Sequence, residues 1–97
     1  MSEAAQALCR RLGVALPIIQ APMAGAQGSA LAIAVTGAGA LGSLPCAMLA
    51  PTAIRAELQA IHCATRHPYN VNFFCHAAPV ADPAREAGWK LRLSSYY

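Results

Sequence analysis

The sequence has few charged residues, and none of them lies between Leu12 and Ile54. Lys and Arg number 7 and Asp and Glu number 4, so the formal net charge is +3. The basic residues are scattered along the chain, whereas nucleic-acid-binding proteins usually gather them on one face or in one tract. The sequence therefore predicts no nucleic-acid partner.

The uncharged stretch also lacks a long continuous apolar run. A membrane helix needs about 20 consecutive apolar residues, but this stretch is interrupted by glycines, polar side chains and the prolines Pro17, Pro22, Pro45 and Pro51. The amino-terminal segment is polar and contains Glu3, which is not typical of a signal peptide. We therefore expect a cytoplasmic protein that does not contact a membrane.

No Cys-x-x-Cys motif is present, and the four cysteines are irregularly spaced. The pairs His62–Cys63 and Cys75–His76 contain zinc-ligand residue types, but two adjacent side chains cannot easily face one metal. We expect no metal site and mostly buried, reduced thiols at Cys9, Cys46, Cys63 and Cys75.

Catalytic constellations are missing as well: no Ser-His-Asp set, paired carboxylates or phosphate-binding loop can be drawn. His62, His67 and His76 are candidate bases only by residue type, and only His76 follows a predicted strand. We interpret all three as solvent or loop histidines, so the sequence predicts no catalytic residue.

The elements that are present alternate between helix and strand. Helices are predicted over Ser2–Leu12, Ser29–Ala38, Pro51–Thr65 and Ala84–Leu93, and strands over Leu16–Gln20, Ala40–Leu44 and Tyr69–Phe74. Caps are predicted at Ser2, Ser29 and Asp82, first-turn prolines at Pro51 and Pro83, and a glycine stop at Gly13. This alternation favours an α/β fold with a parallel sheet in one domain spanning residues 1–97.

The segment Gly37–Gly42, GAGALG, matches the Gly-x-Gly-x-x-Gly dinucleotide fingerprint, and Glu57 follows at a suitable distance. That fingerprint requires a strand before it and a helix starting within it. Here a helix precedes it and an extended exit follows. We interpret it as a helix stop that leads into a strand, and an NAD(P)-binding half-domain stays open as an alternative.

Asn70 and Asn72 are two residues apart, so on a strand they point to the same face. The other face carries Tyr69, Val71 and Phe73, which suit contact with a helix layer. Because unpaired buried amides are costly, the asparagines should face a barrel interior or a ligand pocket. Asn72 is nearer the carboxyl end of the strand and is the better ligand candidate.

The segment Gln20–Gly25, QAPMAG, follows the first predicted strand. Ligands of α/β folds bind beyond the carboxyl ends of strands, which is where Ala21 to Gly25 would lie. Pro22 fixes its φ angle, Met23 is apolar and adaptable, and Gly25 lets backbone approach a flat ligand. An uncharged, backbone-rich exit suits an aromatic cofactor ring better than a phosphate or a metal.

Three segments together resemble the amino-terminal part of the nitronate monooxygenase family. They are LGVALPIIQAPMAG (12–25), TGAGALGSLPCAML (36–49) and YNVNFF (69–74), in the order that the family has them. The resemblance implies an FMN-containing (β/α)8 barrel, of which this chain would form about the first three β/α units. It further implies an oxidoreductase that acts on nitroalkanes or their nitronates with O2.

Carried over by residue, the resemblance implies that Ala21, Pro22, Met23, Ala24, Gly25 and Asn72 lie beside FMN. Because such a barrel needs about 250 residues, the chain is expected to be an inactive fragment on its own. The alternatives are another FMN barrel, such as an enoyl-acyl-carrier-protein reductase, and a non-enzymatic α/β fragment. Unpaired strand edges also predict self-association.

Overall fold

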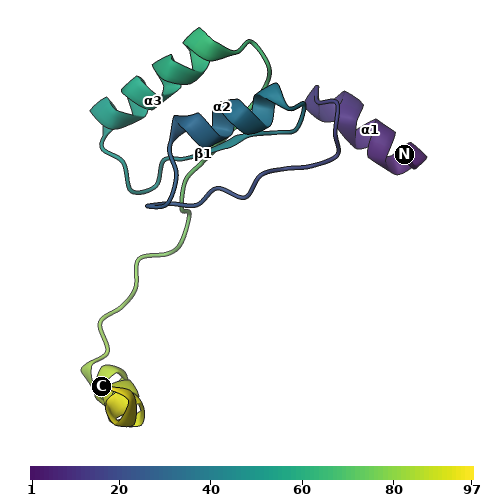
Figure 1. The fold of residues 1–97 in the computed structure, drawn as a ribbon. Coiled ribbons are helices and arrows are strands. Elements are labelled where there is room, and N and C mark those ends of the chain that lie inside the picture. Colours follow the sequence, from purple (N-terminus) through teal and green to yellow (C-terminus); the bar gives the residue numbers. More distant parts are fainter.

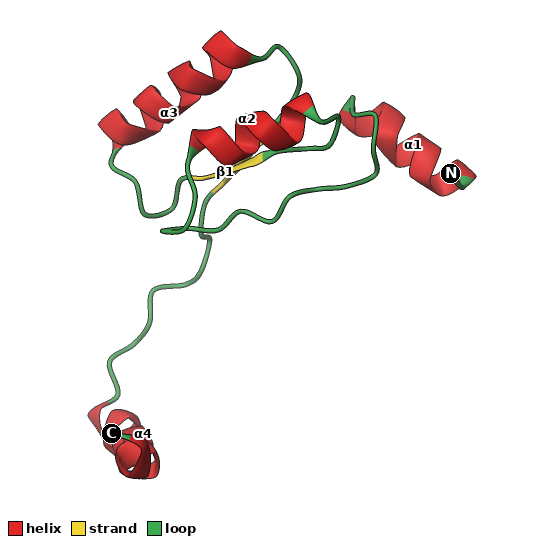
Figure 2. Cartoon of the chain, in the orientation of Figure 1, coloured by secondary structure: helices red, strands yellow, loops and turns green.

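The computed structural model describes all 97 residues and contains four α-helices and two short strands. Helix α1 spans Glu3–Leu12, α2 Ser29–Gly37, β1 Ser43–Pro45, α3 Pro51–Ala64, β2 Asn70–Asn72 and α4 Pro83–Leu93, followed by a 3₁₀ turn over Ser94–Tyr96. Helices α2 and α3 lie on one side of the two strands (Figure 1; Figure 2). The structure thus has the α/β character and the helix–strand alternation predicted from the sequence.

Four of the helix ends follow the predicted local signals. The Ser2 side chain accepts a hydrogen bond from the Ala5 N–H, and Gly13 ends α1 in the left-handed conformation with φ 70°. Pro51 occupies the first turn of α3. The Asp82 side chain caps α4 by accepting a hydrogen bond from the Arg85 N–H. These ends depend only on neighbouring residues, which is why the sequence predicts them.

The predicted cap at Ser29 is wrong. Gly28 is the N-cap of α2, and it has no side chain that could accept a hydrogen bond. The acceptor comes instead from α3, where the Glu57 carboxylate binds the Ser29 N–H. An acceptor from a residue this distant along the chain leaves no local sequence signal.

The strands run parallel, with Ser43 opposite Asn70 and Pro45 opposite Asn72. Both are shorter than predicted. The predicted strand Leu16–Gln20 is reduced to one parallel bridge between Ile19 and Leu41. Ile18 and Ile19 are more than half exposed, so this segment is not covered on both faces. Its outer edge has no neighbouring strand to extend the ladder.

A small core joins α2, β1 and α3. Ala32, Leu44, Cys46 and Ile61 are buried together, and Ile33, Ile54, Leu58 and Tyr69 pack against them. The expectation of mostly buried thiols holds for only half of the cysteines: Cys9 and Cys46 are buried, whereas Cys63 and Cys75 are exposed. The core therefore occupies the space between one face of the strands and the two covering helices.

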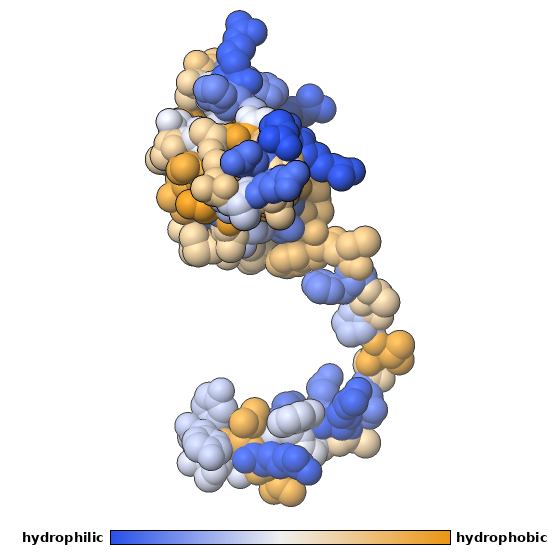
Figure 3. Space-filling model, turned by 90° about the vertical axis from the view of Figure 1, so that its right-hand side faces the viewer, coloured by the Kyte–Doolittle hydropathy of each residue, from blue (hydrophilic) through white to orange (hydrophobic).

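Residues 73–97 form an arm that leaves this body. Its extended part, residues 73–82, leads to α4, which lies away from the other helices (Figure 1; Figure 3). Every residue of the arm is exposed. As a result Val71 and Phe73, expected to face a helix layer, remain 39% and 58% exposed. We refer to residues 13–72 as the body and residues 73–97 as the arm.

The helices do not include a candidate membrane span, since none is both long enough and apolar enough to cross a bilayer.

Candidate site at the carboxyl ends of the strands

The candidate site begins with the loop that follows Gln20. Figure 1 shows this loop and the loop after β1 at the same end of the sheet. Backbone N–H groups of Ala26 and Gln27 both donate to the Met23 carbonyl, at 3.1 and 3.2 Å. Gly25 lies within this turn at φ 78°. A Cβ at this position would meet no atom within 4 Å, so space does not require a glycine here. The left-handed backbone conformation does, since side chains other than glycine rarely adopt it.

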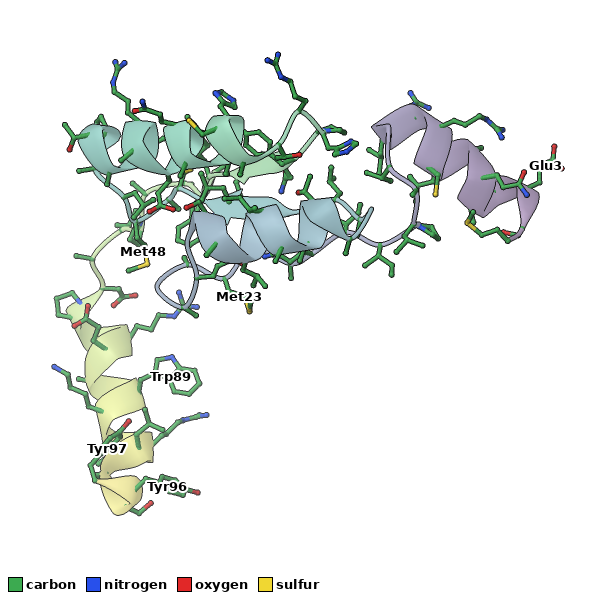
Figure 4. The ribbon with its side chains drawn as sticks, turned by 45° about the horizontal axis from the view of Figure 1, so that its top comes forward. Glu3, Met23, Met48, Trp89, Tyr96 and Tyr97 are labelled. Carbon is green, nitrogen blue, oxygen red and sulfur yellow. The ribbon has the colours of Figure 1, made fainter.

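The predicted loop residues differ in exposure. Ala21, Met23 and Gly25 are exposed, whereas Pro22 and Ala24 are half-buried. Met23 is 45% exposed and lies on the side of α2 that is away from α3 (Figure 4). The loop thus offers an uncharged surface of backbone and one apolar side chain.

The two asparagines of β2 have different environments although both are half-buried. The Asn70 side chain donates a hydrogen bond to the Ser43 hydroxyl at 3.1 Å. The Asn72 side chain makes no hydrogen bond, and only its backbone carbonyl is used, by the Cys46 N–H at 2.9 Å. Asn70 is therefore committed to the protein, while the Asn72 amide keeps its donors and acceptor available for a ligand.

A network of amide side chains, absent from the sequence predictions, connects the loop to β1. It consists of Gln20, Gln27, Ser43 and Asn70. The Gln20 Oε1 accepts from the Ser43 N–H at 3.0 Å, and the Ser43 hydroxyl donates to the Gln20 carbonyl at 2.6 Å. The Gln27 Nε2 donates to the Ser43 carbonyl at 2.9 Å. Two glutamines flanking an uncharged loop were the signal that could have indicated this network.

Cys46 directly follows β1 at this end of the sheet, but it is only 1% exposed. Burial raises the pKa of its thiol, and the nearby Glu57 carboxylate raises it further. The protonated thiol is a poor nucleophile. Cys46 therefore contributes to packing and offers no reactive group.

Glu57 is held in a different role from the one that the dinucleotide fingerprint requires. Hydrogen bonds from the Ser29 hydroxyl and the Ser29 N–H lower the pKa of its carboxyl below the usual range. The Gly37–Gly42 segment follows helix α2 and leads into β1, which is the reverse of the required order. A Cβ on Gly42 would lie 2.3 Å from the Ala32 carbonyl oxygen. Gly42 thus serves close packing, and the order of strand, glycine loop and helix that a nicotinamide-binding fingerprint requires is not present.

The three histidines are exposed and lie outside the loop. His62 and Tyr69 share a hydrogen bond of 2.9 Å between Nε2 and the phenol oxygen. Burial raises the pKa of Tyr69, with a smaller contribution from Cys46. His76 lies in the arm, where its ring centroid is 5.6 Å from that of Phe74. None of these imidazoles is hydrogen-bonded to Met23 or Asn72; their ring contacts are with Tyr69 and Phe74.

The two largest surface cavities lie away from the loop Ala21–Gly25 and from Asn72. One of about 500 Å³ is lined by residues 13–15, 36–40 and His67, before the strands begin. Another of about 670 Å³ lies between α2 and the end of α3. Neither includes Ala21–Gly25 or Asn72. The candidate site is therefore an open surface and not a cavity.

Comparison with known proteins identifies relatives over almost the whole chain. The family model for nitronate monooxygenase matches residues 6–96. A nitronate monooxygenase of Pseudomonas aeruginosa is 49% identical over 80 residues, which cover 82% of this chain and 23% of that protein. One of Paraburkholderia phytofirmans is 41% identical over 92 residues, covering 95% of this chain and 25% of that protein. The chain spans about a quarter of the length of these curated relatives.

Proposed function

This chain belongs to the nitronate monooxygenase family, and on that premise we propose that it forms the amino-terminal part of an FMN-dependent enzyme. The enzyme would oxidise alkyl nitronates with O2 and release the nitrogen in oxidised form. The observation that carries the cofactor assignment is the uncharged loop Ala21–Gly25, which follows a parallel bridge at the same end of the sheet as the unpaired Asn72 amide. The family match carries the reaction class.

We further propose that the body is the first part of a (β/α)8 barrel. Three observations support this: the strands are parallel, the helices alternate with them, and α2 and α3 cover a single face. A closed barrel of this kind takes about 250 residues. Residues 1–97 would then be an amino-terminal fragment of one barrel domain.

The residues at this end suit the ring of FMN. A flat aromatic ring needs apolar contact and a few amide or backbone partners, which Met23, the loop backbone and Asn72 supply. The segments 21–28 and 46–50 are uncharged. A phosphate group usually binds to basic side chains or to a helix N-terminus, so we assign the FMN phosphate to the remainder of the enzyme.

FMN, when bound, would take electrons from the nitronate and pass them to O2. Pro22, Met23 and Ala24 would exclude water from one side of the ring, and the Asn72 amide would orient the ring by a hydrogen bond. None of the histidines of this chain is assigned as a base. We therefore expect the chain to lack turnover by itself.

A complementation experiment tests the proposal. The chain is mixed with the Pseudomonas aeruginosa relative from which the matching amino-terminal quarter has been deleted. We expect bound FMN and nitronate-dependent O2 uptake only from the mixture. A covalent chimera of the same two parts serves as the positive control for assembly.

Two results would contradict the proposal. Nitronate-dependent O2 uptake by the chain alone would disprove its expected inactivity. An assembled, folded chimera without bound flavin would disprove the cofactor assignment. Substituting Asn72 with Ala in the chimera should weaken FMN binding about tenfold, since one hydrogen bond is lost, whereas Asn72→Gln should weaken it less.

We also propose that the chain self-associates in a cytoplasmic setting. The outer edge of β2 and that of residues 18–20 have no strand partner, and such edges favour pairing with another chain. Light scattering across a dilution series would test this: a monomer at every concentration contradicts it.

A further inference from the structure

The side chains of Gln20 and Gln27, which stand on either side of residues 21–26, make almost all the hydrogen bonds that an amide can form: four at Gln27 and three at Gln20. The Gln27 Oε1 accepts from the Gln20 Nε2 and from the Met23 N–H, the latter at 3.2 Å. The Gln27 Nε2 donates to the carbonyls of Ser43 and Gly28, at 2.9 and 3.3 Å. The amide group of a surface glutamine normally forms hydrogen bonds with water. Because the Gln27 amide forms all four of its bonds within the protein, it has a structural role.

Gln20 completes the arrangement from the other side. Its Nε2 donates to Gln27 and, at 3.1 Å, to the Ala21 carbonyl, while its Oε1 accepts from the Ser43 N–H. Asn70 adds a final donor to the Ser43 hydroxyl. The network therefore ties both ends of the loop to β1, and Ser43, its anchor, is completely buried.

The bonds fix the direction of each amide. At Gln27 the oxygen must face the Met23 N–H and the nitrogen must face two carbonyl oxygens. A carboxylate has the same shape but no donor, so it would place an oxygen against the Ser43 carbonyl. Only an uncharged amide satisfies both sides, which explains why two glutamines occupy these positions in a stretch without charges.

We propose that Gln20 and Gln27 are positioning residues that hold the loop in one conformation and thereby set Met23 and its backbone against the flavin. This inference rests on the proposed function. Gln27 acts through the Met23 N–H, at the residue that we place beside the ring. Gln20 acts through Gln27 and Ser43.

The first test uses the chain without flavin. Amide hydrogen exchange is measured for the chain and for Gln27→Glu, Gln27→Met and the control Gln59→Glu. Gln59 is exposed on α3, so its substitution adds the same charge outside the network. We expect exchange at Met23 and Ser43 to become about tenfold faster in both Gln27 variants, because each variant loses the bond from the Gln27 Nε2 to the Ser43 carbonyl and so loosens the loop and its anchor. Gln59→Glu should leave both amides unchanged.

The second test uses the chimera with the Pseudomonas aeruginosa relative and FMN as the probe. Both Gln27 variants should bind FMN about tenfold more weakly and change its visible absorption or circular dichroism. Gln20→Glu should act in the same direction. A purely structural role would lower thermal stability but leave the spectrum of the bound flavin unchanged, so the spectrum separates the two explanations.

The outcomes distinguish this inference from the proposed function. If the wild-type chimera binds flavin and the Gln27 variants match it in affinity and spectrum, the positioning role is overturned and the proposed function stands. If the folded wild-type chimera binds no flavin, the cofactor proposal and the flavin role both fail. If Gln27→Glu does not fold, Gln27→Met supplies the comparison, since it removes the bonds without adding charge.

Discussion

The body and the arm each contain a helix with well-defined ends, α3 and α4, but only α3 is stabilised by buried contacts. Helix α3 packs Ile61, which is completely buried, against Leu44 and Ala32 of the body. Helix α4 has a capping Asp82 and a first-turn proline, yet none of its residues is buried. Isolated helices shorter than about 12–15 residues are marginal in water. Caps therefore specify where a helix begins, whereas buried contacts determine how strongly it is held.

The largest expected difference between the two regions comes from truncating an apolar side chain. Ile61→Ala should destabilise the body by about 2–5 kcal/mol, because a buried side chain is replaced by a cavity. Leu91→Ala in the arm should change the stability of the body by less than about 0.5 kcal/mol, since Leu91 is 77% exposed. Urea unfolding followed through the NMR signals of Tyr69 measures both. Equal effects would contradict the division into body and arm.

A glycine in each region gives the second comparison. A Cβ on Gly42 would lie 2.3 Å from the Ala32 carbonyl oxygen and 2.5 Å from the Thr36 Oγ1, so α2 must move. We expect Gly42→Ala to cost about 1–3 kcal/mol. Gly88 in α4 has no atom within 4 Å of a Cβ, and Gly88→Ala should favour that helix by about 1 kcal/mol.

Circular dichroism and the unfolding midpoint separate these two glycine effects. Gly88→Ala should increase helicity and leave the midpoint of the body unchanged. Gly42→Ala should lower the midpoint. A tolerated Gly42→Ala would show that β1 and α2 can separate without loss.

The same contrast explains which features the sequence could predict. Ser2, Gly13, Pro51 and Asp82 act on residues next to them, so their patterns indicate helix ends correctly. Ser29 fails as a cap because its N–H is bound by Glu57 from another helix. The lengths of the strands are set by pairing between residues far apart in the sequence, such as Ser43 and Asn70, which leaves no local signal.

At the candidate site, the sequence indicates the loop and its uncharged character, but not what holds it. Pro22, Met23 and Asn72 were predicted from their positions at strand ends, and their contact with FMN stays a prediction. In the sequence, Gln20 and Gln27 stand out only as polar residues within an uncharged stretch. Their hydrogen bonds to Ser43 depend on tertiary structure, and no periodicity or spacing encodes them.

A smaller effect on stability is expected from removing the charge of Glu57, the residue of α3 whose carboxylate accepts a hydrogen bond from the first turn of α2. Glu57→Gln keeps an oxygen for the Ser29 N–H but removes the charge, and should destabilise the body by about 1 kcal/mol at neutral pH. The pKa of Glu57 is lowered in the folded protein. Its contribution is therefore present above the pKa of the unfolded chain and lost as the pH falls through the lowered value.

The measurement is unfolding free energy at several pH values for both proteins. The difference between wild type and Glu57→Gln should shrink in acid, below about pH 4. Asp82→Asn, which changes the corresponding acceptor of α4, should leave the stability of the body unchanged at every pH. A difference at Glu57 that grows in acid would contradict the assigned hydrogen bonds.

The smallest expected effect comes from removing α4. Because no element of the body contacts α4, a chain ending at residue 82 should unfold at the same urea concentration as the whole chain, within about 0.5 kcal/mol. The alternative is specific: a right-handed crossover after β2 would bring α4 onto the face where Val71 and Phe73 are exposed. Docking there would make the truncated chain less stable and speed amide exchange at Val71. An unchanged midpoint, together with exchange in α4 faster than in α3, would establish that the caps of the arm specify a helix that the body does not stabilise.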